Sequence, residues 1–188
     1  RCADMSGQGD GLRDKLIAAK QAWAREGRLL TGQTADRDSQ RLPPGQRLVE
    51  NWPVLDLGIQ PAISREAWRL TVDGAVDNPL QWDWAAFLAQ PQVEDVSDIH
   101  CVTQWSRYDN RWQGVATVHV AEQAQLKPGV NHVVLYGYDG YTTNVRLDHF
   151  IASGCLLAHS HDGQPITREH GGPVRVIIPQ YYLWKSAK

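Results

Sequence analysis

Cys101 stands among polar, titratable and aromatic neighbours, in the segment DIHCVTQWS at residues 98–106. A cysteine thiolate can act as a nucleophile or bind a soft metal. A second dense segment, HGGPVR at residues 170–175, runs on towards Lys185 and Lys188. Glycines let backbone amides approach an anion closely, and Arg and Lys side chains can bind one. The two segments together suggest a metal held by an anionic cofactor.

Three chemical roles compete for Cys101 beside a purely structural one. As a nucleophile it would use His100 as base, but adjacent residues of a strand point to opposite faces, so the pairing is geometrically poor. A zinc site has no support from a C-x-x-C or H-E-x-x-H spacing. As the single protein ligand of a cofactor metal, Cys101 needs no second protein ligand. Free cysteines are usually small buried hydrophobes, which is our interpretation of Cys155, and for Cys101 composition alone leaves that role open.

The glycine-rich segment also has a simpler interpretation. Two glycines and a proline could form a turn into a buried strand, with the nearby lysines in solvent. From the residues alone, this turn and an anion-binding segment remain equally open.

Composition limits the remaining choices. The chain of 188 residues is long enough for one domain with a proper core. Its net charge of −2 gives no reason to expect nucleic-acid binding. Three widely spaced cysteines do not form a disulfide framework, and no apolar run is long enough for membrane insertion. With no signal region at the N-terminus, we expect a cytoplasmic protein.

The hydrophobic pattern predicts an α+β fold with mixed sheets and short helices, because strand signals dominate without regular βαβ alternation. We expect an amphipathic helix over 10–27 and an extended polar segment over 28–48. Strands are predicted around 68–73, 93–101, 131–138, 155–161 and 174–178. Short helices are predicted from Asp83 to Leu88, over 117–126, and after Asp148 as a cap. We divide the chain into an N-terminal part, 1–41, and a domain, 42–188.

Two long motifs resemble the sulfite oxidase family. Residues 155–179, CLLAHSHDGQPITREHGGPVRVIIP, are similar to the family pattern L-L-A-x-x-x-x-G-x-P-L-x-x-x-H-G-x-P-x-R-x-x-x-P. Residues 100–115, HCVTQWSRYDNRWQGV, are similar to its short bacterial branch. The resemblance covers about residues 42–188 and implies the molybdopterin-binding fold of that family. It also suggests a chain cut short at its C-terminus, because relatives usually continue past this point.

The resemblance implies a molybdenum-molybdopterin cofactor and oxygen-atom transfer. Cys101 falls at the position of the molybdenum ligand, and Tyr141 at that of the tyrosine facing the oxo group. The positions that contact the pterin and its phosphate fall on His170, Arg175, Ser186, Ala187 and Lys188, and more loosely on Asn51. The partners implied are a small-molecule substrate and an electron-transfer protein.

Departures from the family pattern bear on the substrate. Family arginines that hold sulfite fall at Glu50, near Trp105 or Ser106, and at Lys185, although Arg107 is close by. A pocket with fewer arginines and more aromatic rings favours reduction of S-oxide or N-oxide compounds over sulfite oxidation. The alternatives are a cofactor-binding protein without its own turnover, such as a carrier, and a metal-free Cys-His thiol enzyme.

Overall fold

The computed structural model describes residues 41–56 and 58–188. Its elements, in chain order, are β1 (Arg47–Leu48), β2 (Arg69–Val72), β3 (Leu80–Asp83), α2 (Trp84–Leu88), β4 (Gln92–Cys101), β5 (Trp105–Ala116), α3 (Thr117–Ala124), β6 (His132–Tyr136), β7 (Thr142–Arg146), α4 (Leu147–Phe150), β8 (Leu156–His161), β9 (Gln164–Pro165), the 3₁₀ turn η1 (Arg168–His170), β10 (Arg175–Ile177) and the 3₁₀ turn η2 (Leu183–Lys185). Short helices and mixed strands confirm the predicted α+β class.

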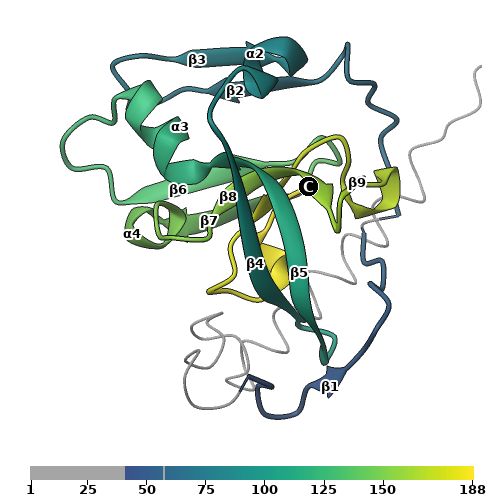
Figure 1. The fold of residues 1–188 in the computed structure, drawn as a ribbon. Coiled ribbons are helices and arrows are strands. Elements are labelled where there is room, and N and C mark those ends of the chain that lie inside the picture. The colour runs from purple at the N-terminus through teal and green to yellow at the C-terminus, as the bar shows by residue number, and fades with distance from the viewer. Residues whose placement is uncertain (1–40, 57) are drawn as a thin grey trace, which may run out of the picture.

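One six-stranded sheet carries the centre of the fold, with the order β1-β5-β8-β10, β4 beside β5 and β9 beside β8. Strand β1 is parallel to β5, and the other pairs are antiparallel. The hairpins β2–β3 and β6–β7 form two smaller sheets. In Figure 1 the β2–β3 hairpin and α2 lie at the top, and β6, β7, α3 and α4 lie to one side.

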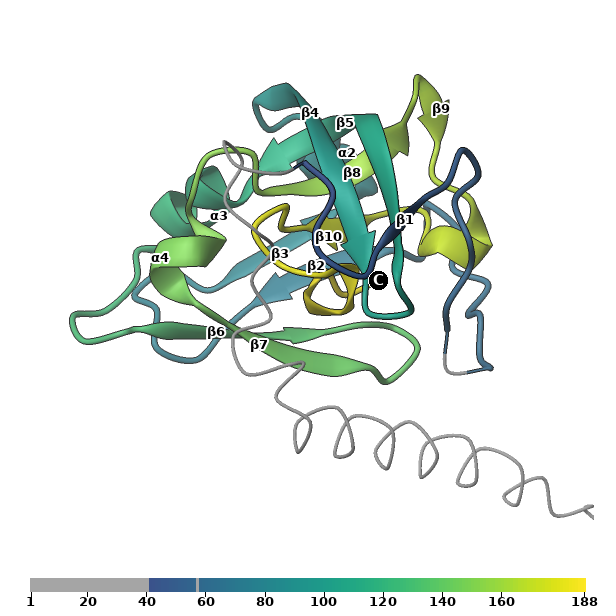
Figure 2. The same cartoon turned by 90° about the horizontal axis from the view of Figure 1, so that it is seen from below.

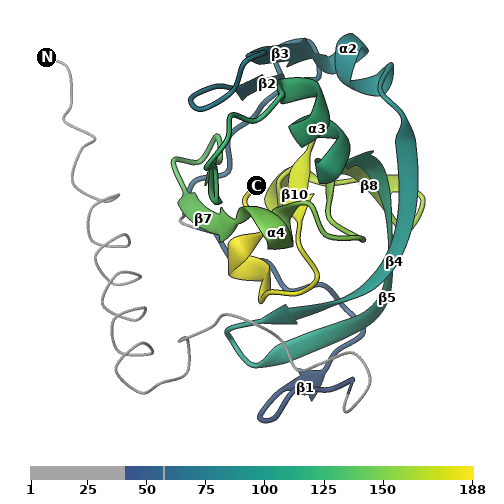
Figure 3. The same ribbon diagram turned by 90° about the vertical axis from the view of Figure 1, so that its left-hand side faces the viewer.

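The β4–β5 hairpin is the longest element pair and positions Cys101. It runs along one side of the molecule, from α2 down to β1, as Figure 3 shows. Its register pairs Gln92 with Val115 at one end and Cys101 with Trp105 at the other. Cys101 therefore lies at the hairpin tip, next to β1.

Two clusters of buried side chains form the core. One contains Trp68, Phe87, Val115 and Ile178 and lies among β2, β3, α2 and α3. The other packs Cys101, Trp105 and Trp112 against β8 and β10, below the C-terminal segment. Figure 2 and Figure 3 show β10 between the β4–β5 hairpin and the β6–β7 hairpin.

Several predicted elements are confirmed within a few residues. Asp83 caps α2 by accepting a hydrogen bond from the Ala86 amide at 2.8 Å. The strand expected over 93–101 is β4, and the helix expected over 117–126 is α3, which ends where Gln125 adopts a left-handed conformation. The helix predicted over 10–27 and residues 28–40 of the extended segment lie outside the described residues.

Other expectations were wrong or incomplete. Asp148 is not a cap: α4 starts after Arg146, and the Asp148 carboxylate lies in the first turn, paired with the Arg146 guanidinium at 2.7 Å. Strands β3, β5 and β7 were not predicted. The strand expected over 131–138 is shorter, because only His132–Tyr136 pair with β7.

Candidate active site

The backbone at the hairpin tip holds Cys101 in a fixed place. Three residues connect β4 to β5, and the third, Gln104, has φ 67°. A turn followed by one left-handed residue is a common three-residue hairpin connection. The Gln104 amide donates to the Cys101 carbonyl at 3.0 Å, and the Cys101 residue is only 2% exposed.

A chain of polar side chains supports this tip from behind. Ser106 donates to the Gln46 side-chain oxygen at 3.2 Å, and the Gln46 amide donates to the Cys101 carbonyl at 3.1 Å. Since the single Ser106 proton goes to Gln46, the His100 Nδ1 that lies 2.7 Å from Ser106 Oγ must be the donor of that contact. His100 thus bonds Ser106 and not Cys101, in agreement with the poor nucleophile–base geometry expected. Burial lowers the pKa of His100.

Cys101 opens onto a cavity of about 210 Å³ between the hairpin tip and the C-terminal segment. Its walls are largely apolar and aromatic, with a few charged groups. The lining residues are Trp52, Pro53, Leu55, Asp56, Cys101, Val102, Thr103, Trp105, Asp139, Tyr141, His170, Arg175, Leu183, Trp184, Ser186 and Lys188. Six of the eight residues proposed from the sequence are therefore brought together: Cys101, Tyr141, His170, Arg175, Ser186 and Lys188.

Arg175 is the one buried cation of the cavity wall, with 5% of the residue exposed. Its guanidinium donates to the His170 carbonyl at 2.8 Å and to the Ser186 carbonyl at 3.0 Å. Among the residues that the structure describes, its Nε has no hydrogen-bond partner and its charge meets no carboxylate within 4.0 Å. Burial lowers the pKa of Arg175 to about 10, so it stays charged at neutral pH. A buried charge with an unused donor fits an anionic group.

Residues 186–188 are held beside the cavity by hydrogen bonds of their side chains and backbone. The Ser186 hydroxyl accepts from the Ile178 amide at 3.0 Å, and the Ala187 carbonyl accepts from the Val176 amide at 2.9 Å. Lys188 Nζ donates to the Glu169 carbonyl at 2.8 Å. Ala187 itself is buried behind the wall and does not line the cavity.

Gly171 lets the 170–175 segment approach Lys188. Its φ is 96°, and a Cβ there would lie 2.2 Å from the Lys188 Cβ. A larger residue would therefore displace Lys188 as well as strain the backbone. The glycine signal in the sequence thus reflects close approach of two cavity walls.

Trp52 is a wall residue that the sequence did not single out. Its ring stacks on His170 with centroids 3.9 Å apart and an interplanar angle of 9°. The Arg175 guanidinium carbon lies 5.3 Å from the centre of the same ring. Asn51, which was proposed instead, is exposed and does not line the cavity. Burial, together with the Arg175 charge, lowers the pKa of His170 to about 4, so its imidazole is neutral at pH 7.

Tyr141 also lines the cavity, and the C-terminal segment holds it in place. Its hydroxyl donates to the Trp184 carbonyl at 2.5 Å. Burial raises the pKa of Tyr141 to about 12, with a smaller contribution from the Asp139 charge. The phenol is therefore protonated at neutral pH and can offer polar contact without charge.

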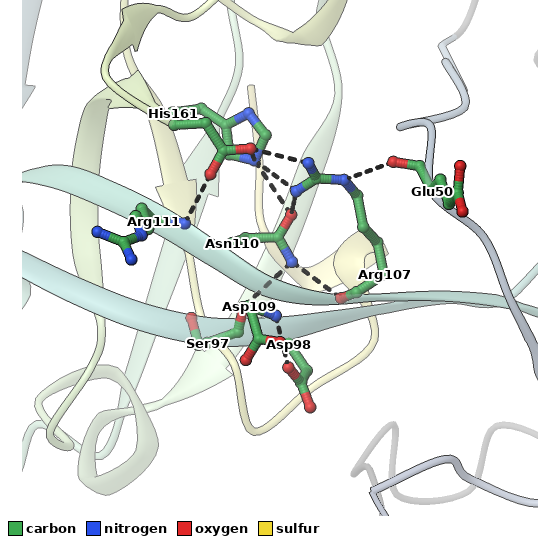
Figure 4. A network of polar contacts seen from close by, with 9 residues as sticks. Glu50, Ser97, Asp98, Arg107, Asp109, Asn110, Arg111 and His161 are labelled. Carbon is green, nitrogen blue, oxygen red and sulfur yellow. Dashed lines mark hydrogen bonds and ion pairs between the residues drawn. The ribbon is translucent and has the colours of Figure 1, made fainter.

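Arg107 and Lys185, the two cations considered as sulfite-binding residues, do not line the cavity. Arg107 donates to the Glu50 carbonyl at 3.0 Å and to Asp162 at 2.8 Å, and it also contacts Asn110 and His161 (Figure 4). Lys185 Nζ donates to the Asn144 carbonyl and side chain at 2.8 and 3.0 Å. Glu50, where a family arginine would fall, is exposed and is not a lining residue of the cavity.

Comparison with known proteins now decides the family. The family described as "oxidoreductase molybdopterin binding domain" matches residues 57–188. The chain belongs to this family. It is 45% identical over 159 residues to the uncharacterized oxidoreductase YuiH of Bacillus subtilis, a match that covers 84% of this chain and 80% of YuiH. The cofactor of the family is molybdenum-molybdopterin, and the chain is an oxidoreductase.

Two further similarities are more distant. The chain is 32% identical to the protein-methionine-sulfoxide reductase catalytic subunit MsrP of Burkholderia mallei, covering 64% of this chain but only 41% of MsrP. The crystal structure of the sulfane dehydrogenase SoxCD from Paracoccus pantotrophus superposes with a TM-score of 0.63 at 18% identity, covering 69% of this chain and 38% of that one. The second similarity concerns the fold alone and confirms the predicted sulfite oxidase fold.

No group of three or more His, Cys, Asp or Glu side chains among the described residues is arranged to hold a metal. A metal at Cys101 would need its other ligands from a cofactor. None of the helices in the described part is long and apolar enough to cross a membrane.

Proposed function

We propose that this family member transfers oxygen atoms at the Cys101 cavity, and that it reduces S-oxide or N-oxide compounds in preference to oxidising sulfite. One observation carries the proposal: Cys101 and the buried Arg175 line the same cavity, and among the described residues Arg175 Nε has no hydrogen-bond partner. A soft metal ligand and an unused cationic donor are the two groups that a metal with an anionic cofactor requires.

The residues fit the cofactor of the family. Cys101 would bind the metal, and the cofactor would supply a two-electron change at molybdenum. His170, Arg175, Ser186 and Lys188 would hold the pterin and its phosphate, with the Ala187 backbone fixing their spacing. Tyr141 would orient the substrate. Asn51 has the least support, because Trp52 and not Asn51 lines the cavity.

The balance of charge in the cavity favours a neutral substrate. Its lining cations are Arg175 and Lys188, with His170 neutral, and both are assigned to the cofactor phosphate. Arg107 and Lys185 are bound elsewhere. Sulfite would lose several charge-assisted contacts, each worth about 1.5–3 kcal/mol. A neutral sulfoxide needs one donor and an apolar wall. The surrounding aromatic rings supply the wall, and Tyr141 would supply the donor by turning its hydroxyl from the Trp184 carbonyl to the substrate.

The similarity to MsrP also supports reduction of S-oxides, since that protein is named a protein-methionine-sulfoxide reductase catalytic subunit. The chain spans less than half of the MsrP length, so the activity and partners of the whole relative are proposals for this chain. Reduction requires two electrons per turnover, which we propose come from a separate electron-transfer partner. The cytoplasmic location expected from the sequence stays a prediction.

The test is steady-state kinetics on protein of measured molybdenum content. A reduced dye donor is used with sulfoxides and N-oxides, and an oxidised dye acceptor with sulfite. We expect turnover of neutral S-oxides and poor or absent sulfite oxidation. Efficient sulfite oxidation at micromolar KM would overturn the substrate proposal, and full loading without any turnover would support the carrier alternative.

A further inference from the structure

Thr103 lies at the middle of the three-residue connection that follows Cys101. Its hydroxyl donates a hydrogen bond to Cys101 Sγ at 3.1 Å, and both residues line the cavity. In the part of the chain that the structure describes, Thr103 is the one uncharged residue whose side chain donates a hydrogen bond to Cys101 Sγ.

Backbone hydrogen bonds of the hairpin connection hold Thr103 in the position that makes this contact. The Gln104 amide closes the turn onto the Cys101 carbonyl, and the left-handed Gln104 returns the chain to β5. The Arg47 amide donates to the Gln104 carbonyl at 3.0 Å, which ties the loop to β1. The Thr103 side chain is thereby directed back over the sulfur two residues earlier.

A hydrogen bond to a thiolate changes the metal it binds. The bond places partial positive charge beside the sulfur, so less electron density is donated to the metal. Hydrogen bonds to ligating sulfurs therefore raise the reduction potential of the bound metal. Groups that contact ligands in this way also orient them.

We propose that Thr103 is a tuning residue: its hydroxyl, bonded to Cys101 Sγ, raises the reduction potential of the molybdenum site and holds the thiolate in place. This rests on the proposed role of Cys101 as the metal ligand. A higher potential would favour the accumulation of reduced metal, the form that reduces an S-oxide.

Two matched substitutions separate the hydroxyl from the shape of the side chain. Thr103→Val keeps the branched volume and removes the donor, while Thr103→Ser keeps the donor and removes the methyl group. The measurements are the midpoint potential of the molybdenum couple by redox titration, and the energy of the sulfur-to-metal absorption band. X-ray absorption counts the sulfur neighbours in each variant.

We expect a lower midpoint potential and a lower-energy absorption band in Thr103→Val, with both near wild type in Thr103→Ser and the sulfur count unchanged. If Thr103→Val has the wild-type potential and band while its sulfur count still includes Cys101, the tuning role is overturned and the proposed function stands. If the sulfur count is the same in wild type and Cys101→Ser, Cys101 is no ligand, and both proposals are overturned. Should Thr103→Val fail to fold, Thr103→Ala removes the same donor without adding bulk.

Discussion

At the scale of single residues, Cys101 is almost fully buried and yet lines a cavity. Its residue is 2% exposed, like a structural cysteine, yet its sulfur lines a cavity. Cys155 is equally buried but lies in the core, where its thiol contacts the His149 carbonyl and the Gln180 side chain. The contrast explains why composition alone left the role of Cys101 open.

The Cys101 assignment is tested by Cys101→Ser. A serine oxygen is a harder and poorer donor to a soft metal than a thiolate. We expect most activity to be lost, with one sulfur neighbour fewer in the X-ray absorption of the loaded protein. Cys155→Ser is the matched control and should leave the sulfur count unaltered. An unchanged count in Cys101→Ser would rule out this ligand.

The Arg175 assignment is tested by cofactor retention. Arg175→Ala removes a charge-assisted contact worth about 1.5–3 kcal/mol, roughly ten- to a hundred-fold in affinity. Molybdenum content after dialysis should fall accordingly, while Arg146→Ala, on the exposed surface, should retain it. Wild-type content in Arg175→Ala would show that this guanidinium does not hold the cofactor.

At the scale of elements, the site depends on how β5 packs against β8. A Cβ on Gly114 would lie 1.9 Å from the Leu157 carbonyl oxygen, at the point where the register of the two strands shifts. Because the obstacle is backbone, a side chain there must push the strands apart. Gly114 is thus required by the packing of β5 against β8, and it needs no role in the active site to explain it.

Gly114→Ala should therefore destabilise the fold by about 3 kcal/mol, the upper part of the usual cost of overpacking. Gly163→Ala is the control: its φ is 75°, but no atom lies within 4 Å of the added Cβ. That change should cost about 1–2 kcal/mol, from the backbone conformation alone. Urea unfolding followed by fluorescence measures both, and equal losses would contradict the packing explanation.

The elements differ in how far the sequence could predict them. Strand β4 and helix α2 follow local patterns, a run ending at Cys101 and an Asp83 cap, and were found. Strand β5 was missed because polar residues break its pattern: Ser106 and Asn110 are fully buried and their side chains form hydrogen bonds. Only the neighbours of β5 in the sheet make such residues compatible with a central strand.

The residues of the site also differ in how far the sequence could predict them. Cys101 and Arg175 lie in recognisable motifs, so the sequence could name them. Trp52 was not named, because its position is set by the rings of Trp112, His161 and His170, which come much later in the chain. The orientation of Arg107 could not be predicted from the sequence either, because it depends on contacts of the guanidinium with Asp162 and His161.

At the scale of the whole molecule, two half-buried histidines make stability depend on pH. Burial lowers the pKa of both His161 and His170 to about 4. The unfolded chain takes up protons near the ordinary pKa of about 6.5, whereas the folded chain does not until about pH 4. The stabilisation is therefore complete above pH 6.5 and is lost as the pH falls towards 4.

We expect each of these histidines to lower the free energy of unfolding by at most about 1 kcal/mol for each pH unit of acidification within that range. Solvent screening of the half-buried rings reduces the full value of about 1.4 kcal/mol. Urea titrations at pH 7, 6 and 5 measure the slope. His161→Gln should flatten it, while His132→Gln, at an exposed position of β6, should not. A slope in His161→Gln that equals wild type would contradict this account.

The cavity joins parts of the chain that are made at different times. Cys101 and its hairpin leave the ribosome some seventy residues before Arg175, and more than eighty before Lys188, while all three line one cavity. During synthesis the thiol side therefore exists without the groups proposed to hold the cofactor phosphate. On the proposed assignment, a nascent chain lacks the groups that would hold the cofactor there. On that assignment, we expect cofactor loading to follow the synthesis of Lys188.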